Sequence, residues 1–241
     1  MNILTAADYA DTGQWRLIVK ISASGMCAHI ENTIHTDLEP QLLFATEWEP
    51  DSDNLLRNIE NAVYDHPRVL EDYSARIIVY DPKTLFMPTE AMEDIEGAEE
   101  NVYTSVYKAD PSDVMVDIEG DLMAAHCLVT GIKGFLNRTF PGAKLESNLM
   151  SKVRTLRQTN DGVKLYLEAR EREADFVLLD GRNLLSASTH PFACAADIVY
   201  HALNIIDVYE LNVKTTPVML SGEGVTEELK ELFKAVNAAQ L

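Results

Sequence analysis

Residues 163–238 contain the pattern that most restricts how this chain can fold. Two runs rich in β-forming residues, 163–169 and 174–179, are followed by Asp180-Gly181, a dipeptide typical of β-hairpin turns. Segments with strand-like and helix-like periodicity then alternate. We expect strands at 163–169, 174–179, 184–189 and 217–220, and helices at 193–209 and 225–238. The stretch therefore predicts an α/β domain with a mixed sheet.

A similar order of elements occurs earlier in the chain. We expect strands at 15–21, 26–30, 41–48 and 76–80, a helix ending at Tyr64, and a second helix with Pro88 in its first turn. Gly25 is expected to supply a positive φ in the turn between the first two strands. Residue identities do not repeat, so the agreement is one of pattern only. It predicts two tandem α/β lobes, residues 1–120 and 121–241, each a mixed sheet with flanking helices.

The middle of the chain connects these patterns. Residues 93–100 are crowded with acids and are predicted to form a solvated connection, because charged side chains are costly to bury. Strands at 114–118 and 122–128 are expected on either side of a Glu119-Gly120 turn. Helices are expected at 129–138 and 147–156.

Composition excludes several classes of protein. Hydrophobic residues make up 46% of the 241 residues, the normal fraction for a globular protein with a core. A net charge of −19 disfavours nucleic-acid binding, because the phosphate backbone would be repelled. The three cysteines are far apart and form no C-x-x-C motif. No apolar run approaches the ~20 residues that span a bilayer, and the start of the chain does not resemble a signal peptide. We expect a cytoplasmic protein without membrane insertion.

The pattern of two lobes resembles the actin-like ATPase (ribonuclease H-like) superfold, in which each lobe has a three-stranded meander followed by alternating helix and strand. The segments 183–192, 196–203 and 217–222 look like those of an uncharacterised family of gut bacteria, a domain of unknown function with this fold. Residues 76–79 and 86–90 are similar to the first-lobe strand and proline turn of that family. The resemblance covers nearly the whole chain and implies the fold, but it leaves the function unknown.

The resemblance also implies where a nucleotide site would lie. Active members of the superfold hold ATP and Mg²⁺ between two hairpins that carry an Asp-x-Gly pattern, and they close over adenosine with a Gly-Gly turn. Carboxylates there hold the metal, and glycines let backbone N–H groups reach phosphate oxygens. The first hairpin of this chain has no carboxylate; Ser22 and Ser24, beside Gly25, could donate hydrogen bonds to an anion, but plain turn residues explain them better. In the second hairpin, Asp180-Gly181 matches superficially, but a plain hairpin turn explains it better.

The third element, Ser221-Gly222-Glu223-Gly224, precedes a helix and best preserves the pattern, since free N–H groups there would meet an anion or a ribose. Glu223 would repel phosphate, however, and a capped helix start, with Thr226 followed by Glu227 and Glu228 at the positive end of the helix dipole, explains the site better. We predict at most a vestigial nucleotide cleft. Its residues would be Ser24, Gly25, Asp180, Gly181, Ser221, Gly222 and Gly224.

Other constellations carry little chemistry. The six histidines show no His-x-x-x-His or His-x-His spacing, so no zinc site is predicted. Asp117-x-Glu119-x-Asp121 resembles the start of an oxygen-rich cation loop but lacks the later glutamate, and a turn at Gly120 is favoured. The sequence predicts no metal site and identifies no catalytic residue.

Two hypotheses for the function remain open. The first is a non-catalytic module that binds a protein partner or scaffolds an assembly, as some actin-like proteins of pilus and secretion machineries do; the acidic surface would suit a basic partner. This function requires no cofactor. The alternative is a divergent ATPase or kinase-like enzyme that binds ATP and Mg²⁺ between the lobes. The sequence predicts neither the partner nor the oligomeric state.

Overall fold

The computed structural model describes residues 12–50, 53–92, 97–128, 130–170 and 172–239. The chain divides into two compact units that interleave in sequence. The first unit comprises Met1–Pro82, Gly97–Asp117 and His126–Asn148. The second comprises Lys83–Glu96, Ile118–Ala125 and Leu149–Leu241.

The first unit is built on a five-stranded mixed sheet with the strand order β3-β2-β1-β4-β8. Its strands are β1 (Trp15–Ile21), β2 (Gly25–Asn32), β3 (Gln41–Glu47), β4 (Ala75–Tyr80) and β8 (Lys144–Ser147). Strands β1, β2 and β3 form an antiparallel meander, whereas β4 is parallel to both β1 and β8. The strands predicted at 15–21, 26–30, 41–48 and 76–80 are confirmed, but β8 was not predicted.

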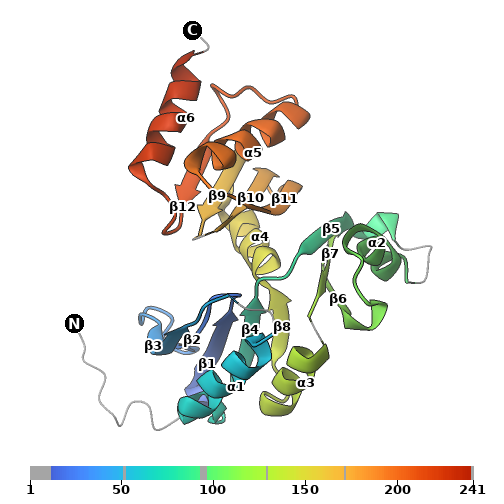
Figure 1. The fold of residues 1–241 in the computed structure, drawn as a ribbon, viewed down its shortest axis with the longest axis vertical. Coiled ribbons are helices and arrows are strands. Elements are labelled where there is room, and N and C mark those ends of the chain that lie inside the picture. Colours follow the sequence, from blue (N-terminus) through green and yellow to red (C-terminus); the bar gives the residue numbers. More distant parts are fainter. Residues whose placement is uncertain (1–11, 51–52, 93–96, 129, 171, 240–241) are drawn as a thin grey trace. The chain divides into compact units, whose positions relative to one another are not determined.

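Two helices pack on this sheet, α1 (Leu55–Asp65) and α3 (Thr130–Thr139) (Figure 1). The period-2 alternation of β1 places Trp15, Leu17, Val19 and Ile21 in the core. Ile59 and Val63 of α1 and Leu136 of α3 are buried in the same cluster. Helical periodicity therefore predicted these two helices correctly, because their apolar faces cover one side of a sheet.

Four elements lie between β4 and α3. They are β5 (Thr84–Pro88), α2 (Ala98–Tyr107), β6 (Val114–Glu119) and β7 (Leu122–Cys127). Two of them, β5 and α2, were not predicted, whereas β6 and β7 confirm the strands predicted at 114–118 and 122–128. Strands β5, β7 and β6, in that order, form a small sheet, with Gly120 at φ +64° in the β6–β7 turn. The expected helix after Pro88 is wrong, since Pro88 ends β5 and only a 3-10 turn, Thr89–Ala91, follows.

The acidic segment 93–100 was also only partly predicted. Residues 93–96 lie outside the described residues. From Ala98 the expectation of a connection is wrong, because α2 begins there. Glu99 and Glu100 lie in the first turn of α2, where negative charge favours a helix through the helix dipole.

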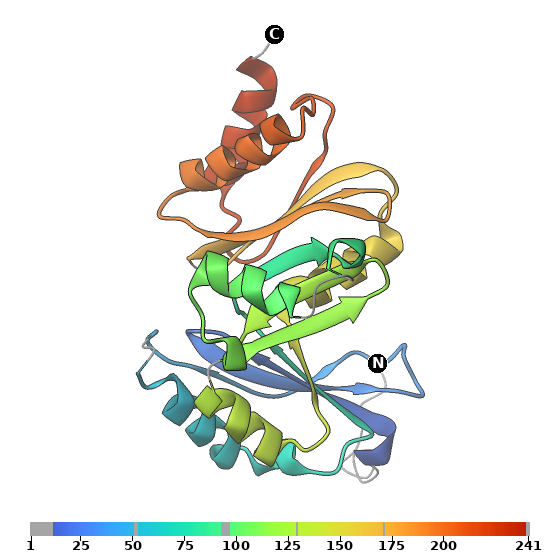
Figure 2. The same cartoon turned by 90° about the vertical axis from the view of Figure 1, so that its right-hand side faces the viewer.

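The second unit contains a four-stranded sheet with the order β11-β10-β9-β12. Its strands are β9 (Val163–Ala169), β10 (Glu173–Asp180), β11 (Asn183–Pro191) and β12 (Val218–Ser221). Again the first three strands form an antiparallel meander and the fourth is parallel to the first. Helices α5 (Ala195–Val208) and α6 (Glu227–Ala239) lie on one face of the sheet (Figure 2).

The other face of this sheet packs against α4 (Asn148–Thr159). Strand β10 is therefore buried on both faces: Phe176 and Leu178 contact the α5–α6 side, and Val177 and Leu179 contact the α4 side. All six elements predicted for residues 163–238 are confirmed. The lobe limits 1–120 and 121–241 stay a prediction. Strand β8 pairs with β4 in the first sheet, although it lies after residue 121 in the sequence.

Candidate functional site

The turn between β1 and β2 carries Ser24 and Gly25 of the predicted cleft. Its polar groups bond within the turn: the Ser22 N–H donates to the Gly25 carbonyl at 2.9 Å, and the Ser24 N–H donates to Ser22 Oγ at 3.3 Å. The Trp48 indole and backbone N–H groups cap the carbonyls of Ala23 and Ser24, each at 2.9 Å. The positive φ expected at Gly25 is wrong. Gly25 is required instead because a Cβ there would lie 2.8 Å from the Thr46 carbonyl oxygen of β3.

The segment after β12 carries Ser221, Gly222 and Gly224. Gly222 has φ +94°, and a Cβ added to it would lie 2.2 Å from the Ala169 carbonyl oxygen at the end of β9. A Cβ at Gly224 would lie 2.4 Å from the Arg170 carbonyl oxygen. The Gly224 N–H donates to the Ala169 carbonyl at 2.9 Å, and Ser221 Oγ donates to the Leu167 carbonyl at 3.2 Å. Close backbone packing therefore accounts for both glycines.

Asp180 and Gly181 lie at the opposite end of the same sheet. Asp180 pairs with Val163 at the start of β9, whereas Ser221 pairs with Glu168 near its end. The hairpin loop itself consists of Gly181, at φ +55°, and Arg182. In strand order, the counterpart of the β1–β2 turn is the β9–β10 turn after Ala169, so Asp180 and Gly181 occupy the next turn along the chain. The remaining cleft residues, Ser24 and Gly25, belong to the first unit.

A buried ion cluster in the second unit was missed by sequence reasoning. The Asp175 side chain on β10 is 1% exposed and accepts hydrogen bonds from Lys152 of α4, from Arg170 at 3.1 Å and from Thr189 Oγ1 at 2.6 Å. Lys152 also pairs with Glu168 at 2.8 Å. Two cations and a hydroxyl thus satisfy one buried carboxylate, as the cost of burying charge requires. This cluster joins β9, β10 and β11 to α4.

A second buried polar network lies in the first unit. His126 is fully buried; its Nδ1 hydrogen-bonds Tyr80 Oη, and its Nε2 lies 2.9 Å from Asp117 Oδ2. One tautomer satisfies all three groups, with Tyr80 donating to Nδ1 and the Nε2–H donating to Asp117. Burial raises the pKa of Tyr80, and the nearby Asp117 carboxylate adds to that shift. The Tyr80 hydroxyl is therefore a poor nucleophile, and the network is suited to holding β4, β6 and β7 together.

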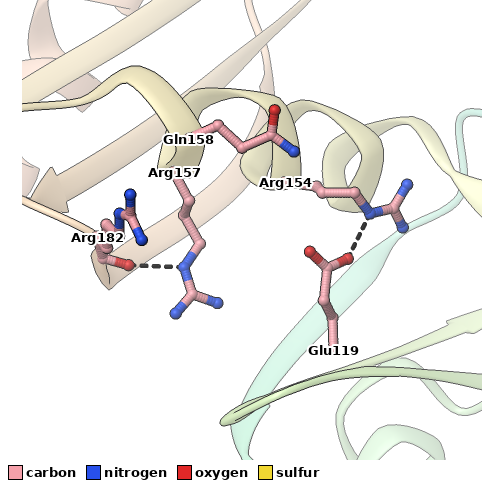
Figure 3. Close-up of a pocket in the computed structure, with 5 residues that line it drawn as sticks. All are labelled: Glu119, Arg154, Arg157, Gln158 and Arg182. Carbon is pink, nitrogen blue, oxygen red and sulfur yellow. Dashed lines mark hydrogen bonds and ion pairs between the residues drawn. The ribbon is translucent and has the colours of Figure 1, made fainter.

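An arginine-lined pocket opens in the second unit (Figure 3). Its walls are formed by Glu119, Arg154, Arg157, Gln158 and Arg182. The Arg157 Nε–H donates to the Arg182 carbonyl at 2.6 Å, and its Nη2 pairs with Asp121 Oδ1 at 2.7 Å. Arg154 pairs with Glu119. The hydrogen bond that Arg157 donates to Asp121 holds the pKa of Asp121 below its ordinary range.

The carboxylates Asp117, Glu119 and Asp121 do not form a cation loop. They pair separately with His126, Arg154 and Arg157. Within the described residues, no group of three or more His, Cys, Asp or Glu side chains is arranged to hold a metal ion. In the same part of the chain, no helix is long and apolar enough to cross a membrane.

Comparison with known proteins shows the family of this chain. Residues 6–238 match the model of a family described as protein of unknown function (DUF3822). The chain belongs to this family. No curated protein matches the chain.

Solved structures show the fold that this DUF3822 chain shares. A Bacteroides thetaiotaomicron protein with an actin-like ATPase fold and unknown function superimposes with a TM-score of 0.82 at 20% identity, covering 96% of this chain and 90% of that one. The actin-like fold and the resemblance to an uncharacterised family are thus confirmed. The PilM-PilN type IV pilus biogenesis complex matches at a TM-score of 0.49 and 15% identity, covering 92% of this chain and 86% of the other. An exopolyphosphatase from Cytophaga hutchinsonii matches at 0.40 and 8%, covering 87% and 66%.

Proposed function

We propose that this protein is a non-catalytic actin-like module of the cytoplasm that binds a protein partner or scaffolds an assembly. One observation carries the proposal: two polar groups of the Ser221–Gly224 segment, which best preserves a nucleotide-binding pattern, are engaged with the β9 backbone. The Gly224 N–H and the Ser221 hydroxyl donate to carbonyls of that strand. Groups already bonded inside the fold have little to offer a phosphate or a ribose.

The turn in the first unit supports the same proposal. No carboxylate stands between Ser22 and Gly25, so the turn has no side chain that would hold Mg²⁺. The Ser22 side chain is directed to the Gly25 carbonyl, at 3.3 Å. If this protein were an ATPase, a side chain of another segment would have to hold the metal.

Charge favours a protein partner with a basic surface. The net charge of −19 gives a long-range attraction to a cationic partner and repels acidic ones. Such attraction raises the association rate and weakens with added salt, because salt screens exposed charges. A salt-sensitive complex is therefore expected.

Calorimetric titration with Mg-ATP separates this proposal from the alternative, a divergent ATPase or kinase. We expect no binding of Mg-ATP in the micromolar range. Micromolar binding would contradict the proposal and would restore Asp180, Gly222 and Gly224 as candidate nucleotide-site residues.

The partner itself is sought by cross-linking in the native cell, followed by titration of the purified partner. We expect a basic protein whose affinity falls between low and physiological salt and does not change when Mg-ATP is added. A complex that forms only with nucleotide present would count against a scaffold role.

A further inference from the structure

The pocket of Glu119, Arg154, Arg157, Gln158 and Arg182 presents three guanidinium groups in a strongly acidic protein. We propose that this arginine pocket binds a phosphoryl oxyanion, either free phosphate or the phosphate group of a small ester. All of its residues belong to the second unit, and none belongs to the predicted nucleotide cleft. The inference is thus independent of the proposed scaffold function.

The structure holds two of the arginines in place before any ligand arrives. The Arg157 side chain is 19% exposed and is fixed from two sides, by the Arg182 carbonyl at 2.6 Å and by Asp121 at 2.7 Å. The Arg154 side chain is 25% exposed and is held through its Nε by Glu119. In the view of Figure 3, Glu119 lies between the guanidinium groups of Arg154 and Arg157. Donors fixed in this way lose little conformational entropy on binding.

Arg182 supplies the charge that is not neutralised. Its carbonyl accepts from Arg157, but its exposed guanidinium group has no acceptor among the described residues. The pocket lining contains three positive charges and one negative charge, and Asp121 outside the lining adds one more negative charge. Arg182 is therefore the arginine of the lining whose charge has no acceptor among the described residues, and an anion would supply that acceptor.

The geometry favours a phosphoryl group over other anions. A guanidinium group donates in a planar fork that matches phosphate or carboxylate oxygens. Three arginines from two segments, α4 and the β10–β11 turn, suit a doubly charged tetrahedral group better than a planar carboxylate with one charge. The pocket volume of about 250 Å³ is below the ~300–1,000 Å³ of sites for drug-sized molecules, so a small group fits.

The test is calorimetric titration of the full chain with inorganic phosphate, phenyl phosphate and acetate, in a buffer without phosphate. We expect saturable binding of one or both phosphates and none of acetate. Arg182→Gln should weaken phosphate binding about tenfold or more, since it removes a charged donor. Because the Arg182 side chain is exposed and has no described acceptor, the thermal midpoint should not change.

Arg172→Gln is the matched control. It removes the same charge from an exposed position of the same unit, at the other end of β10. Unchanged affinity in this variant supports the pocket, whereas equal weakening in both variants shows general charge attraction and overturns the proposal. The proposal is also overturned if binding does not saturate at phosphate concentrations of about 10 mM. Acetate binding as tight as phosphate binding would overturn it as well. Preferential binding of phenyl phosphate identifies an ester as the ligand, and equal binding identifies free phosphate.

The two proposals fail separately. Mg-ATP binding that Arg182→Gln leaves intact counts against the scaffold function and leaves the arginine pocket untouched. Loss of phosphate binding has no bearing on the partner.

Discussion

The two sheets share a topology but differ at the end of the strand that lies parallel to the first one. In the first unit this strand is β4, and it ends at Tyr80, whose side chain is buried and hydrogen-bonded to His126. In the second unit it is β12, which ends at Ser221 and is followed by glycines that contact the backbone of β9. One strand end is fixed by side chains and the other by the backbone.

The two units also bury charge differently. The first unit uses one carboxylate, Asp117, to orient the Tyr80–His126 pair, and the Asp117 side chain is 17% exposed. The second unit places Asp175 fully inside, with Lys152 and Arg170 as counter-charges. A strand order can thus be repeated while the interactions that hold it are replaced, so the order alone does not identify a function.

Asp175→Asn should have the largest effect on stability and should act on the second unit. It leaves Lys152 and Arg170 without a buried counter-charge, which costs about 3–5 kcal/mol when a buried pair is broken. Hydrogen exchange of peptides from β9 and β10 measures the loss. Asp161→Asn, which removes an exposed carboxylate paired with Lys164, should change stability far less, because an exposed ion pair contributes little. Equal effects of the two variants would show that burial is not the cause.

Gly222→Ala should destabilise the second unit by about 2–5 kcal/mol. The added Cβ meets the Ala169 carbonyl oxygen at 2.2 Å, and the φ of +94° is unfavourable for alanine. Gly181→Ala is the control: its φ is also positive, but its Cβ would have no neighbour within 4 Å, so only about 1–2 kcal/mol is expected. Urea denaturation followed by far-ultraviolet circular dichroism measures both. If the two variants were equally stable, contact with β9 would not explain Gly222.

Much of the fold was accessible from the sequence, and the reasons for the failures are specific. Alternation in Trp15–Ile21 and helical periodicity in Ala195–Val208 reflect burial on one face, so both elements were predicted. Strand β8 was missed because it has four residues, and two of them, Glu146 and Ser147, are buried polar residues that no periodicity identifies. Helix α2 was missed because its acidic first turn resembles a solvated loop.

The sites were less accessible than the fold. The spacing of Gly222 and Gly224 predicted a special role for this segment. The structure shows that these glycines are required by contact with the end of β9, which lies more than fifty residues earlier. The arginine pocket combines Glu119, Arg154 and Arg182 from three separate segments. The only signal in the sequence was the short basic run around Arg154 and Arg157, and its acceptors could be found only in three dimensions.

Tyr80→Phe should destabilise the first unit by about 1–3 kcal/mol, because Nδ1 of the buried His126 loses its donor. Both tryptophans, Trp15 and Trp48, lie in the first unit, so their fluorescence during denaturation reports its unfolding. Tyr64→Phe removes an exposed hydroxyl in the same unit and should stay within ±0.5 kcal/mol or so. A Tyr80→Phe protein as stable as this control would mean that the His126 network does not hold β4.

The smallest expected effect is a pH dependence in the second unit. His190 stacks on His201 with ring centroids 4.2 Å apart, and burial, then the neighbouring imidazole, lowers the pKa of His190 below its ordinary 6.5. The unfolded chain therefore binds a proton more readily than the folded one, so stability is full above pH 6.5 and falls as the pH drops through 6.5 toward the folded pKa. Denaturation midpoints at pH 7.5 and 5.5, followed by hydrogen exchange in β11, should separate in the native protein and converge in His190→Gln. An unchanged separation in that variant would assign the dependence to another group.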